Sequence, residues 1–279
     1  MTGRPLFNPV TAVELEAYGR HLSHAVLLTG REGIGLDTAA DYLADQSGGQ
    51  TIRILPEANE KVDLEKGRIT VDVIRRLYDV VRTKSAVPRC IIISAVDTIT
   101  VEAQHAFLKL LEEPTENTSF ILLCHNPGRL LPTVLSRVQQ LQIRRINRHQ
   151  SEALLDSLGV KDVTTRSQIL FIAEGLPGLM TNLAHSPELL EAEAVKLRQA
   201  RATLQGSSYE RLVSIQALKD DRTTAIQVVS YMIALLRREL TGKKTADNET
   251  LQLLKRLESV LVRLGANGNV RLVLAAALL

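Results

Sequence analysis

The sequence predicts an α/β fold, in which a parallel β-sheet with crossover helices is followed by an all-helical C-terminal part. Five short β-like runs stand out in the first half, and most of them are rich in Ile, Leu and Val with little alternation, which is typical of strands buried on both faces. Helical patterns lie between these runs, and alternation of strand and helix builds a parallel sheet. After about residue 146 only helical patterns follow.

The elements of the first half are predicted from their apolar spacing. One helix, over residues 72–81, carries Val73, Leu77, Val80 and Val81 at helical spacing, and a second spans residues 100–113. In the second helix Thr100 suits the N-cap, Glu102 suits the positive end of the helix dipole, and Pro114 ends the helix. Its apolar stripe is Ala103, Ala106, Phe107, Leu110 and Leu111. The predicted strands are residues 25–29, 51–55, 90–95, 119–124 and 139–143.

The second half is predicted to be helical throughout, with glycines and prolines between the helices. We expect an α/β domain over residues 1–146, a small helical domain over 147–186 and a longer helical domain over 187–279. The predicted helices are residues 148–158, 165–174, 177–185, 187–204, 208–219, 222–241, 248–264 and 269–278.

Composition bounds the function. The 279 residues include four Phe, five Tyr and no Trp, fewer aromatic side chains than we expect of a protein that stacks single-stranded bases. The net charge of +3 is too small to indicate nucleic-acid binding by itself. Two cysteines, Cys90 and Cys124, cannot make a four-cysteine zinc site, and both lie in apolar runs. We therefore expect no metal and no cofactor. The longest apolar run, 272–279, is far below the roughly 20 residues that span a bilayer, so we expect a cytoplasmic protein without membrane contact.

A glycine-rich segment follows the first strand. Gly30, Gly33 and Gly35 have the spacing at which backbone N–H groups can curl around a phosphate between a strand and a helix. A working loop then needs Lys, for the β- and γ-phosphates, and Ser or Thr, for Mg²⁺. Leu36 and Asp37 stand there instead. The segment therefore has the scaffold of a phosphate loop without its chemistry, and a plain glycine-rich turn explains the glycines equally well.

A second motif lies at the end of residues 90–95. A P-loop ATPase ends the corresponding strand with two acidic residues. One supports Mg²⁺, and the other polarises the attacking water. Ser94 and Ala95 stand at the matching positions. Asp97 comes later in the chain. There, a solvent-facing loop or cap residue is a simpler interpretation than a metal ligand.

Several segments together resemble the bacterial AAA+ clamp-loader family. They are LKLLEEP at 108–114, FILL at 120–123, LPT at 131–133 and LSR at 135–137, and their order and spacing match over roughly residues 20–185. The resemblance implies an AAA+ P-loop parallel-sheet domain with a helical lid and an all-α C-terminal collar domain that serves oligomerisation.

The resemblance also implies a site. In that family a Ser-Arg-Cys motif supplies an arginine finger in trans to ATP on the neighbouring subunit, and Ser136 and Arg137 match it while Val138 replaces the Cys. Read alone, Arg137 could equally be a surface residue at a helix end. Gly178 stands where the hydrolysing members place a nucleotide-sensing Arg, in a Gly-x-Pro-Gly segment that is also compatible with an ordinary loop.

We therefore expect a clamp-loader subunit without productive ATP binding or activity of its own, which helps to load the sliding clamp onto primed DNA. Its implied partners are the gamma/tau and delta subunits, the sliding clamp, and primer-template DNA reached through the assembled complex. Three alternatives stay open: an ATP-hydrolysing gamma/tau-type subunit, a DNA-binding regulator on a decayed P-loop scaffold, and a purely structural assembly protein in which Arg137 has no catalytic role.

Overall fold

The computed structural model describes residues 5–20, 23–64, 66–82, 87–113, 116–242 and 248–279. The chain forms two compact units, Met1–Lys161 with Ala173–Asn182, and Asp162–Ile172 with Leu183–Leu279. The expected division into residues 1–146, 147–186 and 187–279 stays a prediction.

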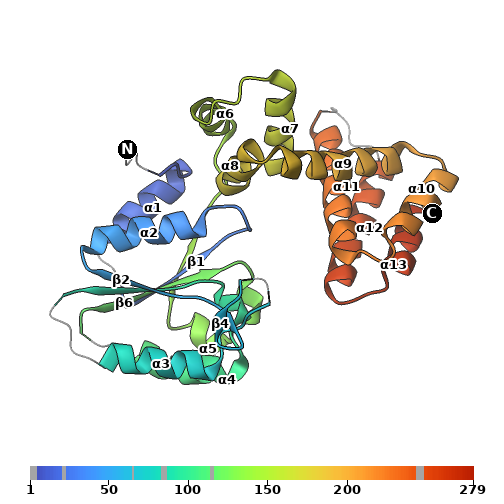
Figure 1. Cartoon of the computed structure of the whole chain (residues 1–279). Coiled ribbons are helices and arrows are strands. Elements are labelled where there is room, and N and C mark those ends of the chain that lie inside the picture. Colours follow the sequence, from blue (N-terminus) through green and yellow to red (C-terminus); the bar gives the residue numbers. More distant parts are fainter. Residues whose placement is uncertain (1–4, 21–22, 65, 83–86, 114–115, 243–247) are drawn as a thin grey trace. The chain divides into compact units, whose positions relative to one another are not determined.

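The first unit is built on a five-stranded parallel sheet with the strand order β2-β5-β6-β1-β7 (Figure 1). Each of the five predicted strands is confirmed, with ends that differ from the prediction by no more than two residues. The strands are β1 (Ala25–Thr29), β2 (Gln50–Ile54), β5 (Arg89–Ile93), β6 (Thr118–Cys124) and β7 (Gln139–Gln142).

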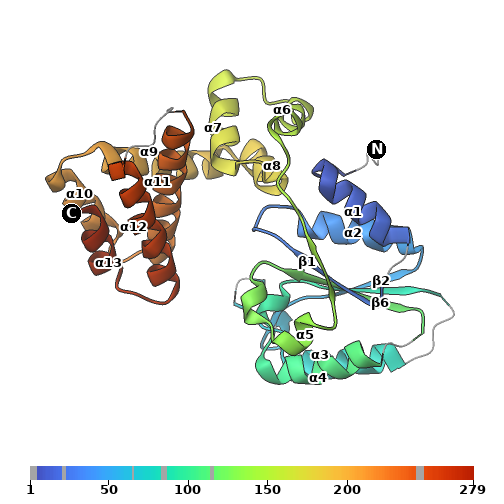
Figure 2. The ribbon, with the colours of Figure 1, turned by 180° about the vertical axis from the view of Figure 1, so that it is seen from behind.

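Helices cover both faces of this sheet (Figures 1 and 2). One face carries α1 (Pro9–Arg20) and α2 (Leu36–Ser47), and the other carries α3 (Val71–Arg82), α4 (Val101–Glu112) and α5 (Pro132–Leu135). The remaining elements of residues 48–162 are the hairpin strands β3 (Glu57–Ala58) and β4 (Lys61–Val62), the 3₁₀ turns η1 (Val96–Thr98) and η2 (Pro127–Arg129), and α6 (Arg148–Ser157).

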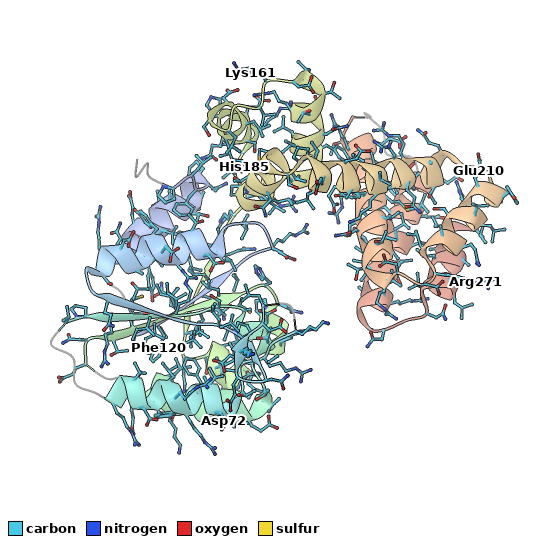
Figure 3. The ribbon with its side chains drawn as sticks, viewed as in Figure 1. Asp72, Phe120, Lys161, His185, Glu210 and Arg271 are labelled. Carbon is cyan, nitrogen blue, oxygen red and sulfur yellow. The ribbon has the colours of Figure 1, made fainter. Side chains whose placement is uncertain are left out.

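The two-sided cover explains why the three inner strands, β1, β5 and β6, read as nearly unbroken apolar runs. In β5, Ile91 and Ile93 pack toward α3 and α4, while Cys90 and Ile92 pack toward α2. On the α4 side, Phe107 and Phe120 meet edge to face with ring centroids 5.4 Å apart (Figure 3 labels Phe120). Since neither face meets water, neither favours polar residues at alternate positions.

The two predicted helices of the first unit follow the expected stripes. Thr100 is the N-cap of α4, where its hydroxyl accepts the Ala103 N–H at 3.3 Å. Helix α4 ends at Glu112, and Pro114 lies outside the described residues. In α3 the predicted stripe is buried except at Val80, which is 38% exposed.

The second unit is all-helical, as expected. Its apolar core lies between the long helices and includes Val228, Met232, Leu257 and Leu274. A capping box starts α10, because the Glu210 carboxylate accepts the Ser207 N–H at 2.7 Å (Figure 3 labels Glu210). The helices that follow α6 are α7 (Val163–Ala173), α8 (Pro177–His185), α9 (Pro187–Gln205), α10 (Ser208–Leu218), α11 (Arg222–Gly242), α12 (Asn248–Gly265) and α13 (Val270–Leu278). Within the described residues, no helix combines the length and apolar character needed to cross a bilayer.

A buried arginine at the start of β5 caps α3. Arg89 is only 6% exposed, and its guanidinium donates to the carbonyls of Val80 (2.6 Å) and Val81 (3.2 Å) in the last turn of α3. These carbonyls lack partners within the helix, and a cation there also meets the negative end of the helix dipole.

We predict that Arg89→Met lowers the free energy of unfolding by about 2–3 kcal/mol, since it removes the donor from two carbonyls, one part-buried and one buried. Urea denaturation measures this change. Arg75→Met serves as the control, because Arg75 lies on the same helix with its side chain 72% exposed and is expected to change stability by less than about 0.5 kcal/mol. An Arg89 variant as stable as the control would contradict the capping role.

Both cysteines are fully buried, and burial raises the pKa of Cys90 to about 11 and that of Cys124 to about 12. Nearby carboxylates, Asp41 for Cys90 and Asp97 for Cys124, act in the same direction. Only the thiolate attacks a disulfide reagent. We therefore predict that the native protein reacts with dithionitrobenzoate at pH 8 no faster than its fold opens to expose the two thiols. Two thiols per chain then titrate at once in denaturant. Rapid modification of the native chain would contradict the burial of these side chains.

Candidate functional site

The glycine-rich segment lies at the carboxyl edge of the sheet, between β1 and α2. Gly33 and Gly35 adopt φ values of 78° and 91°, which favour glycine, and Gly35 is the N-cap residue of α2. At Gly30 an added Cβ would come within 2.8 Å of the Ile34 side chain. The backbone therefore turns as a phosphate loop would, directly before a helix N-terminus.

The two residues after the loop lack the groups that ATP hydrolysis needs. Leu36 is 3% exposed and packs into the core beneath α2, whereas Asp37 is exposed in the first helical turn. A carboxylate at this position repels phosphate. At the end of β5, Ser94 is buried, and Ala95 adopts φ 49° as the chain leaves the strand. Neither supplies a carboxylate.

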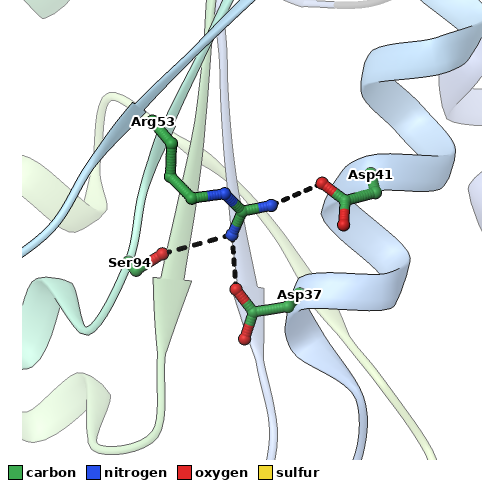
Figure 4. Close-up of polar contacts among 4 residues, drawn as sticks. All are labelled: Asp37, Asp41, Arg53 and Ser94. Atoms are coloured by element: carbon green, nitrogen blue, oxygen red, sulfur yellow. Dashed lines mark hydrogen bonds and ion pairs between the residues drawn. The ribbon is translucent and has the colours of Figure 1, made fainter. Parts of the chain in front are cut away.

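An arginine that the sequence analysis did not identify joins these positions (Figure 4). Arg53, on β2, donates to the Asp37 carboxylate at 2.5 Å and also pairs with Asp41 on the next turn of α2. The same guanidinium reaches the Ser94 hydroxyl at 3.4 Å. Its side chain is 30% exposed, so the cluster borders solvent. The two carboxylates outnumber the one cation, and the cluster keeps a net negative charge.

The sequence did carry a signal for Arg53, because it is a charged residue between two isoleucines in a predicted strand. A charged residue inside such a run is expected to have a partner. The partners could not be read from the sequence, because Asp37 and Asp41 lie 16 and 12 residues away on another element.

The N-terminus of α8 closes against the glycine loop. The Gly33 carbonyl accepts the backbone N–H groups of Gly178 (2.9 Å) and Leu179 (3.3 Å), which are among the first N–H groups of α8. Such groups otherwise attract anions. A Cβ at Gly178 would lie 2.9 Å from the Gly33 carbonyl oxygen, and a Cβ at Gly33 would lie 2.9 Å from the Leu179 Cβ. The close contact leaves no room for a side chain at Gly178.

His125, which follows β6, ties three loops together at the same edge. Its ring Nδ1 lies 2.8 Å from the Gly30 carbonyl oxygen, and its backbone N–H donates to Asp97 at 3.4 Å. The Asp97 carboxylate thus joins η1 to the loop after β6. Among the described residues, no group of three or more His, Cys, Asp or Glu side chains is arranged to hold a metal ion.

Arg137 and Ser136 lie elsewhere, just before β7. Since β7 runs parallel to β1, Arg137 sits at the amino edge of the sheet and Gly30 at the carboxyl edge. About six residues of strand rise separate their levels, which is about 20 Å. The structure thus brings Gly30, Gly33 and Gly35 together and places the Ser-Arg pair far from them.

Three acceptors hold the Arg137 guanidinium. It pairs with the Glu112 carboxylate at the end of α4 (2.7 Å), and it donates to the Thr133 carbonyl (3.0 Å) and the Ser136 hydroxyl (3.3 Å). Its side chain is 37% exposed. Val138, which replaces the Cys of the resembling motif, is buried in the core. It therefore anchors the backbone next to Arg137.

Comparison with known proteins gives partial matches. A family model described as "DNA polymerase III, delta subunit" matches residues 50–147. The chain is 36% identical over 98 residues to DNA polymerase III subunit delta' of Bacillus subtilis, covering 35% of this chain and 27% of that protein. It is 30% identical over 192 residues to the Replication factor C small subunit of Methanococcus maripaludis, covering 62% of this chain and 58% of that protein. The chain thus spans less than two thirds of these relatives.

A solved structure shares the fold over nearly the whole chain. It is a crystal structure of a DNA polymerase III gamma subunit-related protein from Thermotoga maritima, with a TM-score of 0.51 and 19% identity, covering 95% of this chain and 97% of that one. At this identity the likeness shows the fold alone. The parallel sheet behind a glycine loop and the all-helical second unit agree with the expected fold class. Over residues 50–147 the chain is similar to the DNA polymerase III delta subunit family.

Proposed function

We propose that this chain is a delta-prime-type subunit, which takes part in loading the sliding clamp during replication without hydrolysing ATP itself. The observation that carries this proposal is the Arg53 cluster. In this region the phosphates of a nucleotide would need cationic groups, and Mg²⁺ would need a hydroxyl ligand. The side chains found there are Asp37, Asp41 and Ser94, and all three bind the Arg53 guanidinium instead. A net negative cluster disfavours a nucleotide whose phosphates are themselves negative.

The contact between α8 and the glycine loop supports the same proposal. Two N–H groups at the start of α8 are already bound by the Gly33 carbonyl, so they are not available to a phosphate. To admit a nucleotide, the loop would have to give up these hydrogen bonds and the packing of Gly33 against Leu179. No lysine follows the loop to offset the negative charge of the phosphates, because Leu36 stands at that position and its side chain is buried in the core.

The second part of the proposal is that Arg137 acts in trans as an arginine finger. Its place at the amino edge, about 20 Å in strand rise from its own glycine loop, makes a role at that loop implausible. A neighbouring ATPase subunit of the gamma/tau class would gain a guanidinium near its γ-phosphate, where charge builds up in the transition state. Ser136 would support the Arg137 side chain. The proposed partners are gamma/tau and delta subunits, the clamp, and primer-template DNA through the assembled complex.

An ATP-hydrolysing gamma/tau-type subunit is the second candidate. The match to a Replication factor C small subunit fits this candidate as well as it fits the first. The two candidates differ at the glycine loop, where the second needs Leu36, Asp37, Ser94 and Ala95 to support phosphate and metal chemistry. These side chains offer one carboxylate, at the position where a hydroxyl is needed, and no ammonium.

Turnover by the purified chain separates the two candidates. We predict that phosphate release from Mg·ATP equals the rate in buffer alone, because the loop lacks lysine and the β5 end lacks carboxylates. Asp37→Ala is expected to leave this result unchanged, as is Glu32→Ala, which removes another exposed carboxylate of the loop. Hydrolysis that Asp37→Ala abolishes and Glu32→Ala preserves would favour the gamma/tau-type candidate.

Arg137→Ala tests the trans role in the reconstituted loader. An arginine finger contributes about 10³–10⁵-fold to turnover. We therefore expect the ATP site that Arg137 serves to lose its hydrolysis activity. Steady-state turnover of the whole loader then drops by at least the share that this site contributes. The control is Arg148→Ala, which removes an arginine with a 77% exposed side chain. Wild-type turnover by a fully assembled Arg137→Ala complex would remove the finger from the proposal.

A further inference from the structure

Glu112 is the only carboxylate in the described residues that forms an ion pair with Arg137. Its Oε1 lies 2.7 Å from one terminal nitrogen of the guanidinium, and the other terminal nitrogen is held by Thr133 and Ser136. These contacts come from two elements, α4 and the end of α5, so they fix the guanidinium from two sides. At the sequence level Glu112 belongs to the 108–114 segment, where it had no assigned role.

Both ends of this ion pair are anchored in the core. Leu111, which precedes Glu112, is 2% exposed, and Val138, which follows Arg137, is 8% exposed. Their backbones are therefore held, and only the side-chain torsions are left to be ordered. The three contacts can use three of the five guanidinium N–H donors, so two remain for an incoming phosphate.

We propose that Glu112 is a positioning residue for Arg137: it orders the side chain before a neighbouring nucleotide arrives. The proposal rests on the function proposed above. A long arginine side chain loses rotamer freedom when it engages a phosphate, and a contact already made in the free subunit removes part of that cost. Such a contact raises the rate of the chemical step and leaves nucleotide binding by the neighbour nearly unchanged.

The adjoining residue supplies a matched control. Glu113 carries the same charge and is also exposed, at the C-cap of α4, where its N–H donates to Lys109. Within the described part of the chain, its carboxylate forms no ion pair with Arg137. Glu113→Gln therefore changes the local electric field as Glu112→Gln does, but leaves the contact with Arg137 in place.

The test measures kcat and KM for ATP in the reconstituted loader, with the clamp and primed DNA present. We expect Glu112→Gln to slow turnover at the ATP site that Arg137 serves about two- to fivefold, the range for a solvent-exposed ion pair. The kcat of the whole loader then falls by less than in Arg137→Ala, with KM unchanged. Glu112→Asp, which withdraws the carboxylate by one methylene, gives a fall in the same range. Glu113→Gln keeps the wild-type kcat. In an Arg137→Ala background, Glu112→Gln has no further effect.

The remaining outcomes overturn one claim or the other. If Arg137→Ala slows turnover while Glu112→Gln matches or exceeds the wild-type kcat, the positioning role is wrong and the finger stands. If Glu112→Gln lowers kcat by the same factor with and without Arg137, Glu112 acts elsewhere and the positioning role is again wrong. If Arg137→Ala turns over at the wild-type rate, the proposed function fails. Urea midpoints and elution of the stoichiometric complex show that each variant folds and assembles.

Discussion

The ion pairs of Arg53 govern the edge of the sheet where a nucleotide would bind. They connect β2, an edge strand, to the first two turns of α2, and they reach the end of β5 through Ser94. Each exposed pair is worth only about 0.2–1 kcal/mol, so their main effect is on chemistry rather than stability. The guanidinium binds both carboxylates locally, and one net negative charge remains beside the glycine loop.

At the same edge, a second set of groups that could bind a nucleotide is bound within the protein instead. A helix N-terminus next to a glycine-rich turn is a common place for a phosphate, yet here the Gly33 carbonyl takes the N–H groups of Gly178 and Leu179. The glycine at position 178 follows from this contact, because the carbonyl leaves no space for a Cβ. The absence of a side chain at position 178 and the closure of the loop against α8 thus have one physical cause.

Much of the fold could be predicted, because burial on two faces produces unbroken apolar strands and burial on one face produces helical stripes. The N-terminal helix α1 was missed, since its buried residues Thr11, Leu15 and Tyr18 give only a weak apolar stripe. The glycine loop was predicted from its local spacing. The roles of Arg53 and Glu112 were not, because each depends on a partner from another element, and one sequence does not specify which surface charges meet.

Equilibrium binding of Mg·ATP to the purified chain tests the central claim most directly, namely that internal partners already occupy the groups a nucleotide would need. Isothermal titration of the wild-type chain is predicted to show no saturable heat at nucleotide concentrations up to the millimolar range. One nucleotide bound per chain with micromolar affinity would contradict the account.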